Sequence, residues 1–124
     1  MAKKILFIED EAAMQKAMSD LLTVEKYEVV TAMDGEEGLR VAQEESPDLI
    51  LLDLVLPKKD GFAVLNELQS GESTKDIPVI VLTNLETNQD IQQALDAGAR
   101  TYLVKANYEP TEVIEKIDNI LRKG

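Results

Sequence analysis

The chain has 124 residues, 24 of them acidic and 13 basic, which leaves a net charge of -11 with no histidine and no cysteine. This length fits one domain over residues 1–124, and the acidic balance argues against binding nucleic acid alone or an anionic membrane. The missing residue types exclude a Ser-His-Asp triad, a histidine zinc site and disulfides. No apolar run suits a signal peptide or a membrane span, so we expect a cytoplasmic protein.

Short apolar runs alternate with longer segments of helical period along the chain. In chain order, the pattern predicts a strand at 3–8, a helix around 13–22, a strand at 28–32, a helix from 34 to about 45, a strand at 48–53, a helix from 60 to 71, a strand at 78–83, a helix from 87 to 98, a strand at 101–104 and a helix from 110 to 121. Asp34 with Glu37 is typical of a capping box. This alternation predicts a doubly wound parallel α/β sheet of five strands with helices on both faces.

Polar side chains follow the carboxyl ends of four predicted strands. Glu9 and Asp10 follow the first strand, and Asp53 ends the third. Thr83 ends the fourth strand, and Lys105 follows the fifth. Ligands of such sheets bind at the carboxyl ends of the strands, so we expect these side chains to converge. Each has an ordinary structural interpretation when taken singly, such as helix capping for the first two, but their coincidence at one edge favours a functional site.

Three carboxylates gathered at one edge need a compensating cation. At about 5 Å they repel by roughly 3 kcal/mol per pair at an effective dielectric constant of 20. An all-oxygen cluster without histidine or thiol suits Mg²⁺, with Mn²⁺ or Ca²⁺ as substitutes. The Asp53 carboxylate is a competent nucleophile toward phosphorus, Lys105 supplies positive charge, and the Thr83 hydroxyl can donate a hydrogen bond. The sequence therefore predicts phosphoryl transfer assisted by a divalent cation.

These residues, together with Tyr102 and the segment 53–61, resemble the receiver domain of bacterial two-component response regulators, especially the stand-alone type similar to chemotaxis regulators. The resemblance covers essentially the whole chain. It implies a flavodoxin-like fold with five helices and sheet order 2-1-3-4-5, in a phosphoprotein that acts in signal transduction. It also implies a histidine kinase or phosphotransfer protein as phosphoryl donor and a downstream protein as target. We expect a monomer or weak dimer.

The resemblance further implies roles for residues at the carboxyl edge of the sheet. Asp53 is the implied phospho-acceptor, and Asp10, Asp53 and the Val55 backbone carbonyl are the implied direct ligands of Mg²⁺. Glu9, at a position where the family more often has aspartate, is expected to act on the ion through water. Lys105 corresponds to the family's phosphoryl clamp.

Thr83 and Tyr102 resemble the coupled switch pair of the family. Three neighbours depart from its commonest pattern. Asn84 stands where a small residue is usual, which narrows access to the site. Val55 and Leu85 place apolar groups where some relatives carry polar ones that position attacking water. We therefore expect a long-lived phosphorylated form.

Ala106 follows Lys105 where the family usually has proline, commonly after a cis peptide bond. A cis bond before alanine costs about 2.5–4 kcal/mol relative to trans. We predict a trans bond, and the position of Lys105 relative to Asp53 is then the least constrained part of the predicted site.

The main functional hypothesis is a signalling switch that does not turn over an external substrate, so we do not expect an enzyme. A magnesium-dependent phosphohydrolase with an aspartate nucleophile is the alternative, although such enzymes typically carry a carboxylate where this chain has Val55. A flavodoxin-like cofactor binder needs a loop rich in Ser, Thr and Gly after the first strand, where this chain has Glu9, Asp10 and Glu11. Within the signalling hypothesis, a relay intermediate and a terminal effector both stay open.

Overall fold

The computed structural model describes residues 2–122, and its elements follow the predicted alternation. The strands are β1 (Lys4–Ile8), β2 (Glu28–Ala32), β3 (Leu49–Leu52), β4 (Val79–Thr83) and β5 (Thr101–Val104). The helices are α1 (Ala12–Val24), α2 (Gly35–Glu45), α3 (Gly61–Ser70), α4 (Asn88–Asp96) and α5 (Pro110–Leu121), with a 3-10 turn, η1 (Lys105–Asn107), before α5. Residues 3, 48, 53 and 78, which were predicted in strands, lie just outside them.

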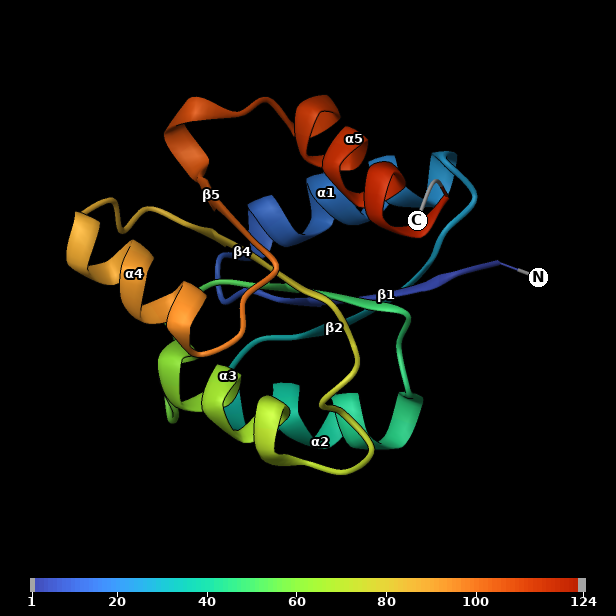
Figure 1. Ribbon diagram of the computed structural model, residues 1–124. Coiled ribbons are helices and arrows are strands. Elements are labelled where there is room, and N and C mark those ends of the chain that lie inside the picture. Colours follow the sequence, from blue (N-terminus) through green and yellow to red (C-terminus); the bar gives the residue numbers. More distant parts are fainter. Residues whose placement is uncertain (1, 123–124) are drawn as a thin grey trace.

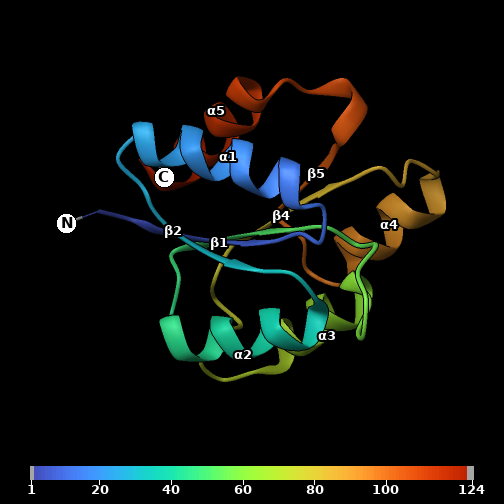
Figure 2. The ribbon, with the colours of Figure 1, turned by 180° about the vertical axis from the view of Figure 1, so that it is seen from behind.

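The strands within residues 2–122 form a five-stranded parallel sheet in the order β2-β1-β3-β4-β5, which confirms the predicted topology. Helices α1 and α5 cover one face, and α2 and α3 cover the other, as Figure 1 and the reverse view in Figure 2 show. Helix α4 belongs to the second group, because its Ala94 packs into the same core cluster as α2 and α3. The chain therefore folds as the predicted three-layer α/β sandwich.

The central strands supply both hydrophobic cores, because successive residues of a strand point to opposite faces. Ile5 and Phe7 of β1 pack on the side of α1 and α5. Leu6 and Ile8 pack on the side of α2 and α3. Strand β3 is fully buried along its whole length, which explains its continuous apolar sequence. Every helix in residues 2–122 is too short or too polar to cross a membrane.

Polar side chains cap α2, α3 and α4, with one shift from the predicted pattern. Asp34 accepts a hydrogen bond from the Glu37 N–H at 2.8 Å, as expected for the cap of α2. The Glu37 carboxylate accepts from the Met33 N–H instead of the Asp34 N–H, so the predicted capping box is wrong by one residue at this end. A reciprocal capping box lies at Glu109 and Glu112, at the start of α5. Sequence reasoning missed it because glutamate is not a preferred cap residue.

Candidate functional site

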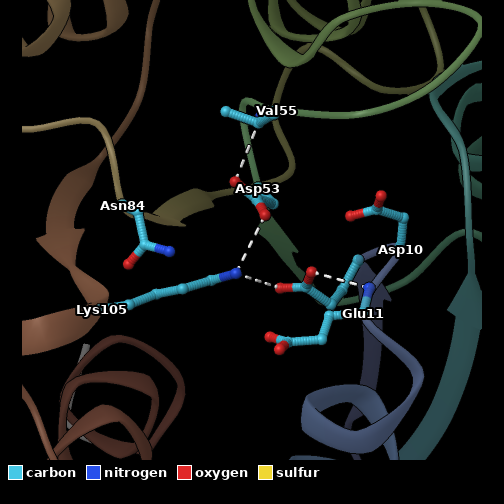
Figure 3. Close-up of a pocket in the computed structure, with 7 residues that line it drawn as sticks. Asp10, Glu11, Asp53, Val55, Asn84 and Lys105 are labelled. Carbon is cyan, nitrogen blue, oxygen red and sulfur yellow. Dashed lines mark hydrogen bonds and ion pairs between the residues drawn. The ribbon is translucent and has the colours of Figure 1, made fainter.

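A cavity of about 400 Å³ opens at the carboxyl edge of the sheet. The residues that line it are Glu9, Asp10, Glu11, Asp53, Val55, Asn84 and Lys105. Figure 3 shows these side chains arranged around Asp53, with Lys105 reaching it from one side and Asp10 from the other. The predicted convergence of strand ends is thus present in the fold.

The parallel register brings the acidic residues together. Ile8 of β1 lies opposite Leu52 of β3, so the residues that follow them, Glu9 and Asp53, leave neighbouring strands side by side. The backbone ladder continues one step beyond the strands, because the Asp53 N–H donates to the Ile8 carbonyl at 3.1 Å. On the other side of β3, β4 pairs with β5 up to Thr83 and Val104, which places Lys105 just past the same edge.

Three carboxylates form a compact cluster in this cavity. One oxygen each from Glu9, Asp10 and Asp53 lies within 4.8 Å of the others. Glu9 and Asp53 are buried, whereas Asp10 is exposed. Such a donor set is all oxygen, carries negative charge and faces an open cavity, which fits a hard divalent cation such as Mg²⁺. The residues present therefore suit the ion that the sequence predicted.

Lys105 is the cation that the structure itself places among these carboxylates. Its Nζ donates a hydrogen bond to Asp53 Oδ2 at 3.0 Å and lies 2.7 Å from Glu9 Oε1 as an ion pair. The peptide bond from Lys105 to Ala106 is trans, as predicted, and η1 begins at Lys105. A proline is thus not needed after the lysine for its side chain to reach Asp53.

Burial and the neighbouring charges shift the pKa values of Glu9 and Lys105 in opposite directions. Burial raises the pKa of the Glu9 carboxyl, and the contact with Lys105 offsets only part of that effect. Burial alone lowers the pKa of the Lys105 ammonium, but its contacts with Glu9 and Asp53 outweigh burial and hold the pKa above the usual value. Lys105 is therefore positively charged at neutral pH.

Backbone groups hold the two buried carboxylates in place. The Val55 N–H donates to Asp53 Oδ1 at 3.2 Å, and the Glu11 N–H donates to Glu9 Oε2 at 3.1 Å. Gly61 fixes the start of α3 against this loop, because a Cβ there would lie 2.5 Å from the Asp53 carbonyl oxygen. The loop after β3 and the helix that follows it thus orient Asp53 together.

The predicted switch residues lie on β4 and β5 and are not among the residues that line the cavity. Thr83 is fully buried at the end of β4, and its Oγ1 has no hydrogen-bond partner among the described residues. The Tyr102 hydroxyl donates to the Leu85 carbonyl at 2.8 Å, which ties β5 to the loop between β4 and α4. Burial, and then the negative charges of Asp90 and Asp53, raise the pKa of Tyr102 to about 12.

The sequence interpretation gave no site role to Glu11, although it lines the cavity and its N–H orients Glu9. Its position directly after the two acidic residues was the available signal. The sequence marks Asn84 only as a departure from the commonest family residue after Thr83, and the structure places it on the cavity wall. Of the predicted site residues, Glu9, Asp10, Asp53, Val55 and Lys105 line the cavity. Thr83 lies at the same edge at the end of β4, whereas Tyr102 lies within β5, opposite Val81.

Fold and site together define a receiver-type α/β domain, with an acidic cluster and a lysine at the carboxyl edge of a parallel sheet. The response regulator receiver domain family matches residues 5–118, and the chain belongs to this family. Receiver domains of response regulators are signalling modules of two-component systems and not classical enzymes.

Curated relatives are longer than this chain. The DNA-binding dual master transcriptional regulator RpaA of Synechocystis sp. is 42% identical over 120 residues, which make up 97% of this chain and 49% of RpaA. The chain spans about half the length of the curated relatives of this kind that it matches.

Solved receiver structures share the fold over nearly the whole chain. The receiver domain of the sensor histidine kinase PA1611 from Pseudomonas aeruginosa, with a magnesium ion coordinated in its active site cleft, is 28% identical with a TM-score of 0.86, covering 96% of this chain and 97% of that one. The phosphorylated cyanobacterial phytochrome response regulator RcpA is 33% identical with a TM-score of 0.83, covering 97% and 94%.

Proposed function

We propose that residues 1–124 form one receiver domain in which Asp53 accepts a phosphoryl group from a histidine kinase or a phosphotransfer protein. The observation that supports this most directly is the placement of the Asp53 carboxylate, buried at the cavity floor and in contact with a lysine. The resulting change in charge alters the affinity of the surface around α4 and β5 for a downstream protein.

The proposed transfer forms one bond and breaks one bond. A carboxylate oxygen of Asp53 bonds to phosphorus while the phosphorus–nitrogen bond of the donor phosphohistidine breaks. The bonding electrons stay on the imidazole nitrogen, which then takes up a proton. The Val55 N–H and Lys105 Nζ hold the two Asp53 oxygens at 3.2 and 3.0 Å, so the nucleophile is oriented before the donor arrives.

The acidic cluster supplies the proposed cation site. Asp10, Asp53 and the Val55 backbone carbonyl would hold Mg²⁺, with Glu9 acting through water and with Mn²⁺ or Ca²⁺ as substitutes. When bound, the ion neutralises charge on the phosphoryl oxygens. Lys105 contributes a second positive charge beside Asp53, and the free Thr83 hydroxyl is available as a donor to a phosphoryl oxygen. The magnesium in the PA1611 receiver domain supports this assignment.

The proposed readout involves Thr83 and Tyr102. Thr83 precedes the loop whose Leu85 carbonyl accepts the Tyr102 hydrogen bond. A Thr83 side chain that turns toward a phosphoryl group pulls on this loop, and the bond to Tyr102 transmits the shift to β5. The switch therefore couples the chemistry at Asp53 to the α4 and β5 surface.

The composition of the chain and its family support the proposed location, oligomeric state and lack of turnover. We place the protein in the cytoplasm, as a monomer or weak dimer that does not bind nucleic acid or membrane by itself, in keeping with the net charge of -11. It releases no product from an external substrate over many cycles, because Val55 occupies the position where an aspartate-dependent phosphohydrolase typically needs its acid.

Small-molecule phosphorylation tests this function. Incubation with Mg²⁺ and acetyl phosphate should add the mass of one phosphoryl group to the intact protein. Asp53→Asn should show no addition, because an amide is not a nucleophile toward phosphorus at neutral pH. An unchanged wild-type mass, or an equal gain in the Asp53→Asn variant, contradicts the proposal.

The lifetime of the phosphorylated protein is a second test. Val55 is 56% exposed beside Asp53 and offers no polar side chain to orient attacking water. Asn84 lines the same cavity. We expect Val55→Asn to speed the loss of the phosphoryl group severalfold, measured by intact mass after removal of the donor, and a wild-type half-life of seconds contradicts this expectation.

A further inference from the structure

Both oxygens of Glu9 have protein partners, as do those of Asp53, but the Glu9 side chain is the more deeply buried of the two. Its side chain is 1% exposed, Oε1 lies 2.7 Å from Lys105 Nζ, and Oε2 accepts the Glu11 N–H at 3.1 Å. Asp10, in contrast, is exposed to solvent. The Glu9 carboxylate is therefore held by an ion pair at Oε1 and by a backbone hydrogen bond at Oε2.

The lysine contact to Glu9 is shorter than its contact to Asp53. The two distances from Lys105 Nζ are 2.7 Å to Glu9 Oε1 and 3.0 Å to Asp53 Oδ2. Lys105 follows an edge strand and has a trans peptide bond after it, and a lysine side chain is flexible. The position of its ammonium therefore depends on the charges around it, and Glu9 is one of the two buried carboxylates that contact it, alongside Asp53 itself.

We propose that Glu9 is a positioning residue for Lys105, in addition to its contribution to the charge of the cation site. This inference rests on the proposed phosphorylation of Asp53 for its functional meaning. The additional methylene of glutamate gives the carboxylate the reach to the lysine. Replacing it with aspartate shortens the side chain by about 1.5 Å, which takes the oxygen out of contact while preserving the negative charge. The length of residue 9 then matters for Lys105, and its charge matters for the cation.

Two substitutions separate length from charge. Glu9→Asp keeps the charge and loses the contact to Lys105. Glu9→Gln keeps the length, and its amide oxygen can still accept from Lys105, but it loses the charge. We expect Glu9→Asp to lower the maximal rate of phosphorylation by acetyl phosphate about tenfold, while its Mg²⁺ affinity stays within about threefold of wild type. Glu9→Gln should show the reverse order, with the smaller loss of rate and the larger loss of Mg²⁺ affinity.

A double-mutant cycle with Lys105→Met tests whether Glu9 acts through the lysine. In the Lys105→Met background, Glu9→Asp should change the maximal rate less than twofold. Lys58→Met is the matched control, because this nearby lysine lies 3.9 Å from Asp34 and should leave the rate within twofold of wild type. Equal rate losses from Glu9→Asp in both backgrounds, or a wild-type rate in Glu9→Asp, overturns the inference.

Unfolding in urea without Mg²⁺ or donor keeps this test independent of phosphorylation. The loss of stability caused by Glu9→Asp should fall by at least half in the Lys105→Met background, because the contact is then already gone. An additive pair of losses overturns the positioning role even if Asp53 is phosphorylated normally. If the wild-type protein takes up no phosphoryl group but the losses couple, the proposed function fails while the structural role of Glu9 stands.

Discussion

Each end of the sheet contains a lysine that joins two carboxylates, and the two arrangements differ in their surroundings. At the carboxyl edge, Lys105 contacts Glu9 and Asp53, whose side chains are 1% and 6% exposed. At the amino edge, Lys4 contacts Glu45 at 2.9 Å and Glu28 at 3.6 Å, with glutamate side chains that are 43% and 57% exposed. The same chemistry is therefore solvated at one end and buried at the other.

The difference in burial supports the carboxyl edge, and not the amino edge, as the place of the proposed switch. Exposed ion pairs contribute little, since water solvates each charge when its partner is lost. Buried carboxylates without a partner are costly, so they respond strongly to any cation or anion that enters. The two edges also differ in how their polar groups are paired. At the amino edge, the Lys4 N–H donates to Asp48 Oδ2 at 2.8 Å. At the carboxyl edge, the Thr83 hydroxyl has no hydrogen-bond partner among the described residues.

The largest expected effect comes from removing the buried lysine charge. Lys105→Met leaves Glu9 and Asp53 without their cation and should reduce the free energy of unfolding by about 3 kcal/mol at neutral pH without divalent ions. Lys4→Met should be indistinguishable from wild type. Urea unfolding followed by circular dichroism measures both, and equal losses at the two ends would remove the basis of the comparison.

Magnesium should stabilise only the carboxyl edge. At a Mg²⁺ concentration about 100 times its Kd, the free energy of unfolding should rise by about 2.7 kcal/mol, and EDTA should reverse the gain. Asp10→Ala should abolish the gain because it removes a carboxylate of the cluster. Glu45→Ala at the amino edge should retain it. Stabilisation that survives in Asp10→Ala would place the ion elsewhere.

Two tyrosine hydroxyls extend the comparison of the two edges to variants with smaller expected losses of stability. Tyr27, next to the start of β2, is 4% exposed, and its hydroxyl donates to Asp118 of α5. Burial, and then this carboxylate, raise the pKa of Tyr27 to about 12. Tyr27→Phe should reduce the free energy of unfolding by about 1.5 kcal/mol, because a hydrogen bond to a charged group is lost.

The pH dependence of that loss has a defined sign. A folded-state pKa above the unfolded value of about 10 means that folding favours the neutral phenol. The contribution of Tyr27 is complete below pH 10 and is lost as the pH rises through about 12. The difference between wild type and Tyr27→Phe should therefore shrink over this window in urea unfolding, and a constant difference contradicts the assignment.

Of the two tyrosine variants, Tyr102→Phe is expected to have the smaller effect on stability. Its hydroxyl bonds to a neutral carbonyl on a loop, so the loss should be below about 1 kcal/mol. The same variant should lower the difference in target affinity between phosphorylated and unphosphorylated protein, if the proposed switch uses this bond. A stability loss larger than that of Tyr27→Phe would contradict the expected order of the two tyrosines.

Much of the fold followed from local patterns. The apolar run of β3 and the caps at Asp34 and Asp60 indicated their elements directly, and parallel strand ends must meet at one edge. This was enough to bring Glu9, Asp53 and the other site residues together. The class of site was therefore predictable from residue type and position alone.

Contacts between side chains distant in the chain were not predictable in the same way. The Tyr27 hydroxyl bonds to Asp118, and the Tyr102 hydroxyl bonds to the Leu85 carbonyl. Packing sets the rotamers of the two tyrosine side chains, and no local sequence pattern encodes that packing. The ion pair from Glu9 to Lys105 depends on the direction of two long side chains. Sequence placed both residues at the edge but did not show that they touch.

The position of β5 makes the placement of Lys105 depend on an edge strand. This strand is the last in sequence among residues 2–122, lies at the border of the sheet and pairs with β4 there. A nascent protein that lacks it, or one whose border strand has opened locally, still carries Glu9, Asp10 and Asp53 but has no lysine among them. Under the proposed function, phosphorylation of Asp53 at its full rate therefore requires β5 to be paired with β4.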